Sequence, residues 1–486
     1  MLLERALIGI TAFGAYIPRL RLQRETISRA SSWFDSSLAS LARGERSICN
    51  WDEDTVTMAV AASRDATDVA MRDGIEALFL ASTTHPFLDR QNSVIVSEAL
   101  NLRPAVRAMD VGGSQRAGTS ALLCAVDAVR SGCSSALVIG SEHRRTRVGS
   151  RLEMLSGDAA AALVIGKERV LAHFVEAYSV ACDFVDHYRM DGFEFDYEWE
   201  ERWIRDEGYL NLVPLAVSGL LEKAGLAIGN VDHFILPSLQ QHVSTTVAKH
   251  LELAPDKVVD GLLDSCGQTG VAHPVLLLAH TLERAAPGER ILAIGFGQGC
   301  DALLFQATGG ITSAPRKRGV SGWLEQRVPD ANYARFQTFN DLVEREYGKR
   351  AEGDKLTPMS ALFRNRKMVN SFLAGRCVQC GTVQFPKSVY CVNPECGAAD
   401  TQTDHPMADE TGTVRTWTAD HLTFDMNPPA YFGMVEFDGG GRAMMDFTDV
   451  FPETLDVGTP VTVQFRIKQF DKQRGFRRYF WKASPA

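Results

Sequence analysis

Two segments of this chain share one pattern of strands, turns and helix. Residues 108–142, AMDVGGSQRAGTSALLCAVDAVRSGCSSALVIGSE, and residues 261–297, GLLDSCGQTGVAHPVLLLAHTLERAAPGERILAIGFG, share one order of elements. Each has a β-rich run, a turn of Gly, Ser and Gln, an apolar helix, a Gly-containing turn and a second β-rich run. A helix that is small and apolar on nearly every face, such as 118–130, is expected between two layers. The repeat predicts two similar halves whose turns face each other.

The remaining strand patterns extend this duplication into an α/β fold. Strands are predicted at 75–82, 106–111, 136–140 and 161–166, and again at 233–237, 258–263, 291–296 and 302–306. We therefore expect an amino-terminal half over 1–167 and a carboxy-terminal half over 168–308. A polar stretch with Pro315, Pro329 and Pro358 predicts a linker with short helices over 309–367.

Four cysteines after this linker have the spacing of a metal site. Cys377-x2-Cys380 and Cys391-x4-Cys396 are separated by ten residues, and a glycine follows the second cysteine of each pair. Two such pairs supply four thiolates for a structural Zn²⁺. Unrelated reduced thiols, labile disulfides or a site that has lost its metal are the alternatives. The other cysteines are scattered and expected to be reduced: Cys49, Cys124, Cys133, Cys182, Cys266 and Cys300.

The segment after the cysteines reads as a small β-barrel. Strands are predicted at 412–417, 433–437 and 461–467, and the DGGG sequence at 438–441 predicts a hairpin turn. The cysteine region is thus a zinc ribbon over 368–407, and the barrel covers 408–486.

Length and charge exclude some classes of protein. A chain of 486 residues is too long for one hydrophobic core, and a net charge of −9 argues against a dedicated nucleic-acid binder. Residues 1–18 carry charges and glycines that interrupt the apolar run of a signal peptide, and no stretch is long and apolar enough to span a bilayer. We expect a cytoplasmic protein without a membrane partner.

Several motifs resemble the thiolase superfamily. They are IGITAFGAYIPRLRL, ASTTHPFLDR, DVGGSQRAGTSAL, GDAAAALVIG, FILPSLQQH and GFGQGCDALLFQ, in this order. They are most similar to the 3-hydroxy-3-methylglutaryl-CoA (HMG-CoA) synthase branch and to ketoacyl synthase III. RCVQCGTVQFPKSVYCVNPECG and PPAYFGMVEFDGGGR resemble the zinc-ribbon and OB-fold (DUF35-type) domain that accompanies thiolase-type enzymes. The resemblance implies a duplicated thiolase-like α/β fold with layered sheets and buried helices, followed by a zinc ribbon and an OB-fold barrel.

The resemblance also implies an acyl-CoA substrate, a homodimer and a possible second thiolase-like subunit. It places the catalytic positions of the family on other residue types. The nucleophilic cysteine falls on Gln115, the histidine of the second half on Ser238 and the polar residue of the facing turn on Gln268. The acid/base glutamate of the synthase branch falls on Thr83. Because a glutamine forms no acyl-enzyme, acyl transfer on a cysteine at this position is not expected.

Other residues in or near these turns remain candidates. His85, His242 and His273 are possible general bases, each with a structural hydrogen bond as the alternative. Cys266 is either a displaced nucleophile or a small buried hydrophobe. The candidates for binding substrate are Thr83, Ser114, Cys266, Gly297, Gly299, Arg144 and Arg147. Backbone N–H groups near Gln115 and the 297–299 turn are expected to form an oxyanion site.

Three charged or aromatic segments have more than one interpretation. The arginines at 144, 145, 147 and 151 suit CoA phosphates or a solvated surface, and Glu142 suits the site or a turn. The acidic, aromatic loop 184–203 suits a substrate tunnel or a dimer contact. The basic and aromatic run at 472–481 suits a single-stranded nucleic acid, an acyl-CoA or a solvated hairpin.

The leading hypothesis is a retro-aldolase acting on a 3-hydroxyacyl-CoA, since thiolase-like aldolases that pair with this zinc and OB module also lack the cysteine. An acyl-thioester decarboxylase is one alternative, suggested by Gln115. A condensing acyltransferase with a displaced nucleophile and a non-catalytic acyl-CoA-binding partner subunit are the others.

Overall fold

The chain folds into two compact units. The computed structural model describes residues 7–240, 242–315, 318–346, 358–451 and 454–486. The first unit comprises 1–50, 54–94 and 103–342, and the second comprises 51–53, 95–102 and 343–486. Among the described residues, no helix has both the length and the apolarity needed to cross a membrane.

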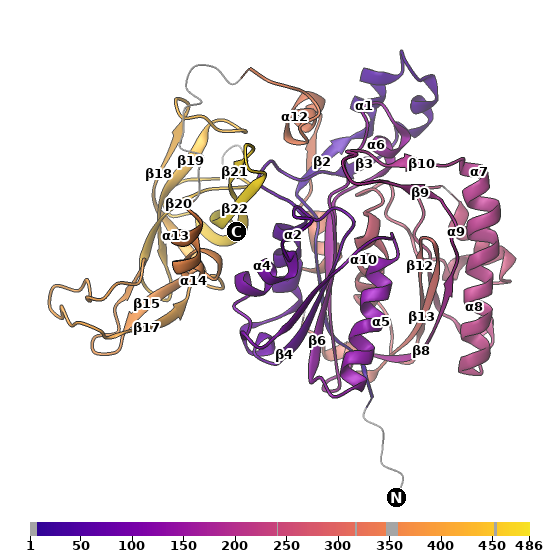
Figure 1. Cartoon of the computed structure of the whole chain (residues 1–486), viewed down its shortest axis with the longest axis horizontal. Coiled ribbons are helices and arrows are strands. Elements are labelled where there is room, and N and C mark those ends of the chain that lie inside the picture. The colour runs from indigo at the N-terminus through magenta and orange to yellow at the C-terminus, as the bar shows by residue number, and fades with distance from the viewer. Residues whose placement is uncertain (1–6, 241, 316–317, 347–357, 452–453) are drawn as a thin grey trace, which may run out of the picture. The chain divides into compact units, whose positions relative to one another are not determined.

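A nine-stranded mixed sheet organises the first unit, in the order β11-β12-β13-β8-β1-β7-β6-β4-β5 (Figure 1). Its strands are β1 (Gly9–Tyr16), β4 (Ile75–Ala81), β5 (Arg107–Val111), β6 (Ser135–Glu142), β7 (Ala159–Gly166), β8 (Ala172–Ala181), β11 (His233–Ile235), β12 (Arg290–Phe296) and β13 (Gly299–Ala307). β4 runs parallel to β5 and β6, and β11 runs parallel to β12. Residues 1–167 contribute five of these strands and residues 168–308 contribute four.

The strand predicted at 258–263 is wrong. Only Val258 pairs there, in an isolated bridge to Phe234. The chain then turns, with Leu262 at a φ of 55°. A left-handed residue inside this apolar run ends any extended ladder, so the run becomes a partly buried loop that leads to Gln268.

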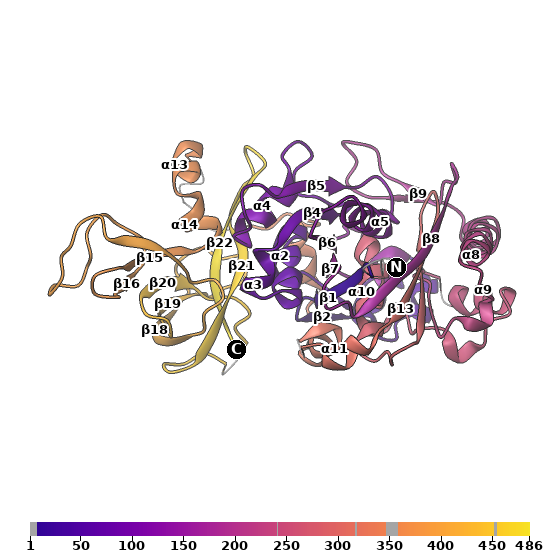
Figure 2. The same cartoon turned by 90° about the horizontal axis from the view of Figure 1, so that it is seen from below.

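Helices form layers on and between the two halves of the sheet. The main helices are α2 (Thr55–Ala66), α5 (Ala117–Arg130), α8 (Leu210–Ala224) and α10 (His273–Leu282). α5 contacts β4 and β6 of the first half and β12 and β13 of the second, and α10 likewise contacts β6, β7, β11 and β12. α2 covers β1, β6 and β7, and α8 covers β8 and β13 (Figures 1 and 2). The predicted layered fold with buried helices is confirmed.

Glycine lets the two buried helices begin close together. A Cβ at Gly118 in the first turn of α5 would lie 2.4 Å from the carbonyl oxygen of Val271, just before α10. A side chain at position 118 would therefore separate the two turns that the repeat brings face to face.

Smaller elements complete the first unit. The helices are α1 (Arg24–Ser31), α3 (Val69–Arg72), α6 (Arg151–Leu155), α7 (Glu201–Trp203), α9 (Val243–His250), α11 (Gly319–Glu325) and α12 (Tyr333–Phe339). α4 (Asn92–Ala99) has its first three residues in the first unit and the others in the second. The strands are β2 (Leu20–Gln23), β3 (Glu45–Ser47), β9 (His187–Tyr188), β10 (Tyr197–Glu198) and β14 (Val328–Asp330). A π-helical segment, Ile204–Tyr209, joins α7 to α8. α11 and α12 lie in the predicted linker, of which residues 316–317 and 347–357 are outside the described residues.

The second unit contains a three-stranded and a five-stranded sheet. α13 (Met359–Arg364) and α14 (Arg366–Asn370) precede β15 (Leu373–Cys377), β16 (Val383–Gln384) and β17 (Gln402–Pro406), which pair in the order β16-β15-β17. β18 (Gly412–Asp420), β19 (Ala430–Phe437), β20 (Arg442–Asp446), β21 (Pro460–Asp471) and β22 (Phe476–Pro485) pair in the order β20-β19-β18-β21-β22.

The five-stranded sheet closes on itself. Phe447, directly after β20, pairs with Ala483 of β22, so the two edge strands of the sheet meet. Val435, Val463 and Trp481 are buried inside. The expected hairpin turn at 438–441 joins β19 to β20. The predicted β-barrel is confirmed.

Candidate functional site

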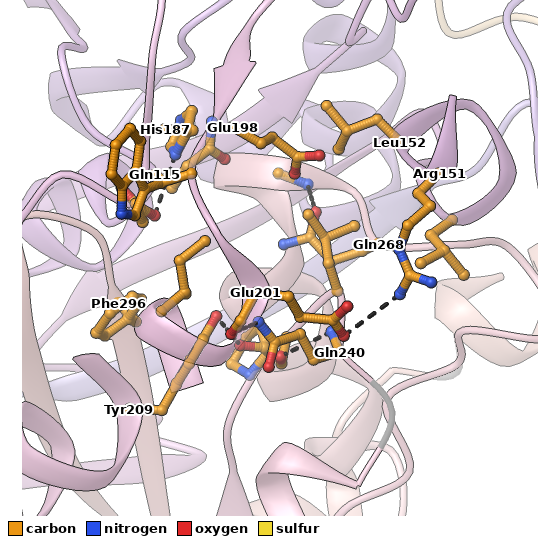
Figure 3. A pocket seen from close by; sticks show the side chains of 18 of the residues that line it. Gln115, Arg151, Leu152, His187, Glu198, Glu201, Tyr209, Gln240, Gln268 and Phe296 are labelled. Carbon is orange, nitrogen blue, oxygen red and sulfur yellow. Dashed lines mark hydrogen bonds and ion pairs between the residues drawn. The ribbon is translucent and has the colours of Figure 1, made fainter. Parts of the chain in front are cut away.

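Three turns from the two halves of the first unit meet at one cavity of about 280 Å³ (Figure 3). Gln115 precedes α5, Ser238 follows β11 and Gln268 precedes α10, and all three line this cavity. The structure thus brings together the three positions that the sequence resemblance places at the catalytic centre. Two of the three side chains are amides and the third is a hydroxyl.

Gln115 belongs to a partly buried hydrogen-bond chain. Its Nε2 donates to Thr83 Oγ1 at 3.3 Å, and Thr83 donates to Glu142 through its hydroxyl at 2.8 Å and its N–H at 3.2 Å. Glu142 is fully buried at the end of β6. Gln115 Oε1 is buried and accepts no hydrogen bond from the residues that the structure describes. Leaving a buried polar atom unsatisfied costs about 1–3 kcal/mol, so the position of this oxygen carries an energetic cost.

The backbone around Gln115 is shaped by Ser114 and the glycines after β12. Ser114 Oγ donates to the carbonyl oxygen of Gly297 at 2.7 Å. A Cβ at Gly297, where φ is 156°, would lie 3.1 Å from the backbone nitrogen of Gln115. The N–H of Gly297 donates to Gly299 O at 3.0 Å, so it is not available as an oxyanion donor. The N–H of Gln115 makes no backbone hydrogen bond within the described residues.

A buried carboxylate fixes the start of α5. Asp301 on β13 accepts hydrogen bonds of 2.7–3.0 Å from Arg116, Thr119, Ser120 and Ser179. These bonds join the first turn of α5 to β13 and β8. They hold the helix end, whose dipole favours negative charge, beside the cavity.

The turns of the second half are closed by local hydrogen bonds. Ser238 Oγ accepts from the N–H of Gln240 at 3.0 Å, and Gln268 Oε1 accepts from the N–H of Gly270 at 2.8 Å. Ser156 forms an isolated β-bridge with Gln268. Both side chains therefore shape their turns as well as lining the cavity.

The ionisable groups of the cavity come mainly from the acidic, aromatic loop. Asp186 lines it. So do His187, Glu198, Glu201 and Arg151, which Figure 3 labels. His187 Nδ1 lies 3.0 Å from Asp186 Oδ2, and Arg151 pairs with Glu201 at 3.3 Å. The sequence marked this loop as one possible wall of a tunnel but did not single out His187. The only sequence signal was an adjacent Asp-His pair within it.

Arg144 lies in the cavity wall and Arg147 does not. Arg144 is 3% exposed and pairs with Asp196 at 2.6 Å. Asp196 also pairs with Arg189 at 3.0 Å. Arg147 is exposed beside the ring of Phe195.

The three predicted histidine bases do not line the cavity. His273 Nδ1 accepts from the N–H of Thr269 at 3.1 Å, and its Nε2 lies 2.9 Å from Gly261 O, so both nitrogens are used. Burial lowers the pKa of His273 to about 4. His242 is exposed at the start of α9. Both ring nitrogens of His85 are buried, and burial lowers its pKa.

Cys266 does not line the cavity either. It is fully buried, and its thiol lies 3.4 Å from Gly267 O. Burial raises the pKa of this thiol to about 11, which keeps it protonated at neutral pH.

The four cysteines of the second unit form one cluster. Their Sγ atoms lie within 4.8 Å of one another. Cys377 and Cys396 are 3.9 Å apart, and Cys380 and Cys391 are 3.5 Å apart. Four sulfurs at about 2.3 Å from a tetrahedral zinc lie about 3.8 Å apart, so the cluster fits Zn²⁺ with no open position.

Comparison with known families matches both units. Residues 221–305 match the family described as 3-oxoacyl-[acyl-carrier-protein] synthase III C terminal. Residues 364–402 match the ChsH2 rubredoxin-like zinc ribbon domain, and residues 405–466 match the ChsH2 C-terminal OB-fold domain.

Curated relatives decide the family of the first unit. The chain is 30% identical over 346 residues to the hydroxymethylglutaryl-CoA synthase of Methanocaldococcus jannaschii, which covers 69% of this chain and 99% of that protein. The chain belongs to the hydroxymethylglutaryl-CoA synthase family. The synthase of Methanothermobacter thermautotrophicus is 32% identical over 305 residues, which cover 61% of this chain and 87% of that protein. The thiolase-like core fused to a zinc ribbon and an OB-fold, as predicted, is confirmed.

Solved structures share the fold of the family. An HMG-CoA synthase complexed with CoA has a TM-score of 0.61 at 16% identity and covers 72% of this chain and 95% of its own. The 3-oxoacyl-(acyl carrier protein) synthase III of Pseudomonas aeruginosa has a TM-score of 0.56 at 19% identity and covers 62% of this chain and 98% of its own.

Proposed function

We propose that this member of the family makes or breaks a carbon–carbon bond of an acyl-CoA without a covalent nucleophile, by retro-aldol cleavage of a 3-hydroxyacyl-CoA. The observation that carries the proposal is the set of side chains on the three turns. Gln115, Ser238 and Gln268 line the cavity, and no cysteine is among the described residues that line it. Amide and hydroxyl groups stabilise charge and orient a substrate, but they do not form the acyl-enzyme of cysteine-based family members.

Retro-aldol cleavage needs a base for the 3-hydroxyl proton and a site for the thioester enolate. The N–H of Gln115 lies at the start of α5, where the helix dipole favours the enolate oxygen. Its side-chain amide is oriented through Thr83 and Glu142. The N–H and the side-chain amide of Gln115 therefore support a site for the thioester enolate.

The cavity supports a short, polar acyl group. Its volume of about 280 Å³ is at the lower end of small-molecule sites, and charged side chains form one wall. We propose a CoA thioester as the substrate because the chain is related to hydroxymethylglutaryl-CoA synthases and shares its fold with an HMG-CoA synthase complexed with CoA.

Zn²⁺ on the four cysteines is proposed to stabilise the fold of the second unit. A cytoplasmic homodimer, with a possible second thiolase-like subunit, remains a proposal.

An acyl-thioester decarboxylase is the second candidate function. The buried, unpaired Oε1 of Gln115 favours it, since an amide at the nucleophile position resembles an acylated cysteine. Decarboxylation would use the same enolate site but no base for a hydroxyl proton.

The test is mass spectrometry of CoA products after the zinc-loaded full chain is incubated with 3-hydroxyacyl-, 3-oxoacyl- and malonyl-type CoA thioesters of short chain length. A shortened acyl-CoA together with an aldehyde or ketone supports the aldolase. Loss of carbon dioxide supports the decarboxylase instead. CoA-dependent cleavage of a 3-oxoacyl substrate would contradict the aldolase and indicate a cysteine nucleophile, for which Cys266 is the candidate.

Two variants sharpen this test. Gln115→Ala removes the amide and is expected to lower kcat by about 100- to 1,000-fold. Gln306→Ala removes the same residue type on β13, where its amide donates to Gly288 O, and is expected to leave kcat unchanged. Product formation by neither the native protein nor its variants, with CoA binding kept, would identify a non-catalytic acyl-CoA-binding subunit.

A further inference from the structure

A histidine and an aspartate that are neighbours in sequence form a pair in the cavity wall. His187 starts β9 and lies opposite Glu198 of β10, and both of these side chains line the cavity (Figure 3). The distance from His187 Nδ1 to Asp186 Oδ2 is 3.0 Å. The side chains are 16% and 12% exposed, so the pair is largely shielded while it borders the cavity.

The pair is arranged so that one ring nitrogen stays free. Burial alone would raise the pKa of Asp186, but the hydrogen bond and charge of His187 outweigh it and hold this pKa below its usual value. Asp186 is therefore an ionised acceptor for Nδ1–H. Nε2 of His187 makes no hydrogen bond within the residues that the structure describes. A neutral imidazole held in this tautomer presents its lone pair at Nε2.

Other ionisable groups of the cavity fit the role of base less well. Glu201 is paired with Arg151, and Arg144 is paired with Asp196. Glu198 lies beside His187, and although burial raises its pKa, no side chain orients its carboxylate within the described residues. A neutral imidazole accepts a proton and its conjugate acid can return it, which suits proton transfer in both directions.

We infer that His187 is the base that takes the proton of the substrate's 3-hydroxyl group, and that Asp186 is the positioning residue that fixes its tautomer. The inference rests on the proposed retro-aldol function. Nε2 removes the hydroxyl proton, the O–H electron pair becomes the C=O bond of the released aldehyde or ketone, and the C2–C3 bond breaks. Its electron pair forms the thioester enolate, and the imidazolium then returns the proton to C2 to give the shortened acyl-CoA.

The experiment compares steady-state cleavage by the full chain and three variants. His187→Gln is expected to lower kcat by about 100- to 10,000-fold while KM changes by less than about threefold. Asp186→Asn is expected to lower kcat as well, because an amide no longer selects the Nδ1–H tautomer. His233→Gln removes a histidine whose Nε2 lies 2.8 Å from Glu289 outside the cavity, and it is expected to keep the native kcat.

Two further measurements separate a catalytic role from a structural one. Added imidazole is expected to restore part of the activity of His187→Ala, since it refills the space next to Asp186. In the ¹⁵N spectrum, the His187 ring is expected to be the Nδ1–H tautomer in the native protein and a mixture of tautomers in Asp186→Asn. Native kcat in His187→Gln would overturn the inference and leave the retro-aldolase standing.

A second reaction tests the base when no 3-hydroxyacyl-CoA is cleaved. If His187 returns the proton to C2, it should also remove a C2 proton from the shortened acyl-CoA. The C2 hydrogens of acetyl-CoA or propionyl-CoA should therefore exchange with D₂O. Exchange that is lost in His187→Gln supports the base even if the cleavage assay fails and the proposed substrate is wrong. Exchange that persists in His187→Gln, or that is absent from the native protein, would overturn the inference.

Discussion

The fully buried His273 makes the stability of the first unit depend on pH. Burial lowers its folded-state pKa from 6.5 to about 4. Below about pH 6.5 the unfolded chain binds a proton at this residue while the folded chain does not, so stability is lost as the pH falls. Because a tenfold difference in proton affinity between the two states is worth about 1.4 kcal/mol, the full loss is about 3 kcal/mol near pH 4. Between pH 7.5 and pH 5 the expected loss is about 2 kcal/mol.

His273→Gln removes this titration. The substitution breaks the hydrogen bonds to Thr269 and Gly261 and should cost about 1–3 kcal/mol at pH 7.5. The gap in unfolding free energy between the native chain and the variant should then shrink by about 2 kcal/mol at pH 5. Urea titration with pulse proteolysis and mass spectrometry of peptides from the first unit measures this gap.

The exposed His250 at the end of α9 supplies the control. His250→Gln should keep the pH dependence of the native chain, because its side chain is exposed. If the native and His273→Gln curves of free energy against pH run parallel, the buried neutral imidazole is not the cause and the reasoning fails.

Three further perturbations test the framework of the site and the zinc cluster. Asp301→Ala should lower stability by about 3–5 kcal/mol, seen as a lower Tm, because it leaves Arg116 and three hydroxyl donors without their acceptor. Gly295→Ala should destabilise the first unit and lower turnover, because the new Cβ would lie 2.0 Å from Thr119 Oγ1; an unchanged Tm would contradict this. Native mass spectrometry should find one zinc per chain, and Cys391→Ser should lose it. This variant should also show faster hydrogen exchange in β15 and β17 but not in β7. Cys124→Ser, on the exposed side of α5, should keep the metal.

The sequence predicted the elements with strong local patterns. The repeated strand–turn–helix unit gives the positions of α5 and α10, because their apolar faces and Gly/Ser/Gln turns are local features. The strand expected at 258–263 failed because an apolar run alone does not show that Leu262 adopts a left-handed conformation. Tertiary packing of the turn before Gln268 decides that conformation.

The candidate site was predicted in part. Gln115, Ser238 and Gln268 meet at the cavity because they follow from the order of motifs along the chain. His187 was missed because it lies in an irregular loop, where neither helical nor strand periodicity shows which side chains point inward. Glu142 was left undecided between the site and a solvated turn, and its hydrogen bonds to Thr83 place it behind Gln115.

The hairpin of β9 and β10 has a consequence for how such a protein could be redesigned. The sheet and its buried helices supply amides and a hydroxyl, whereas the imidazole and the carboxylates of the cavity come from one stretch, 186–201. Exchange of residues 186–201 alone would replace the imidazole and the carboxylates, while the nine strands of the sheet keep their pairing. The sheet and the ionisable side chains of the cavity can therefore be changed independently. Replacing residues 186–201 is a route to a new reaction on the same fold.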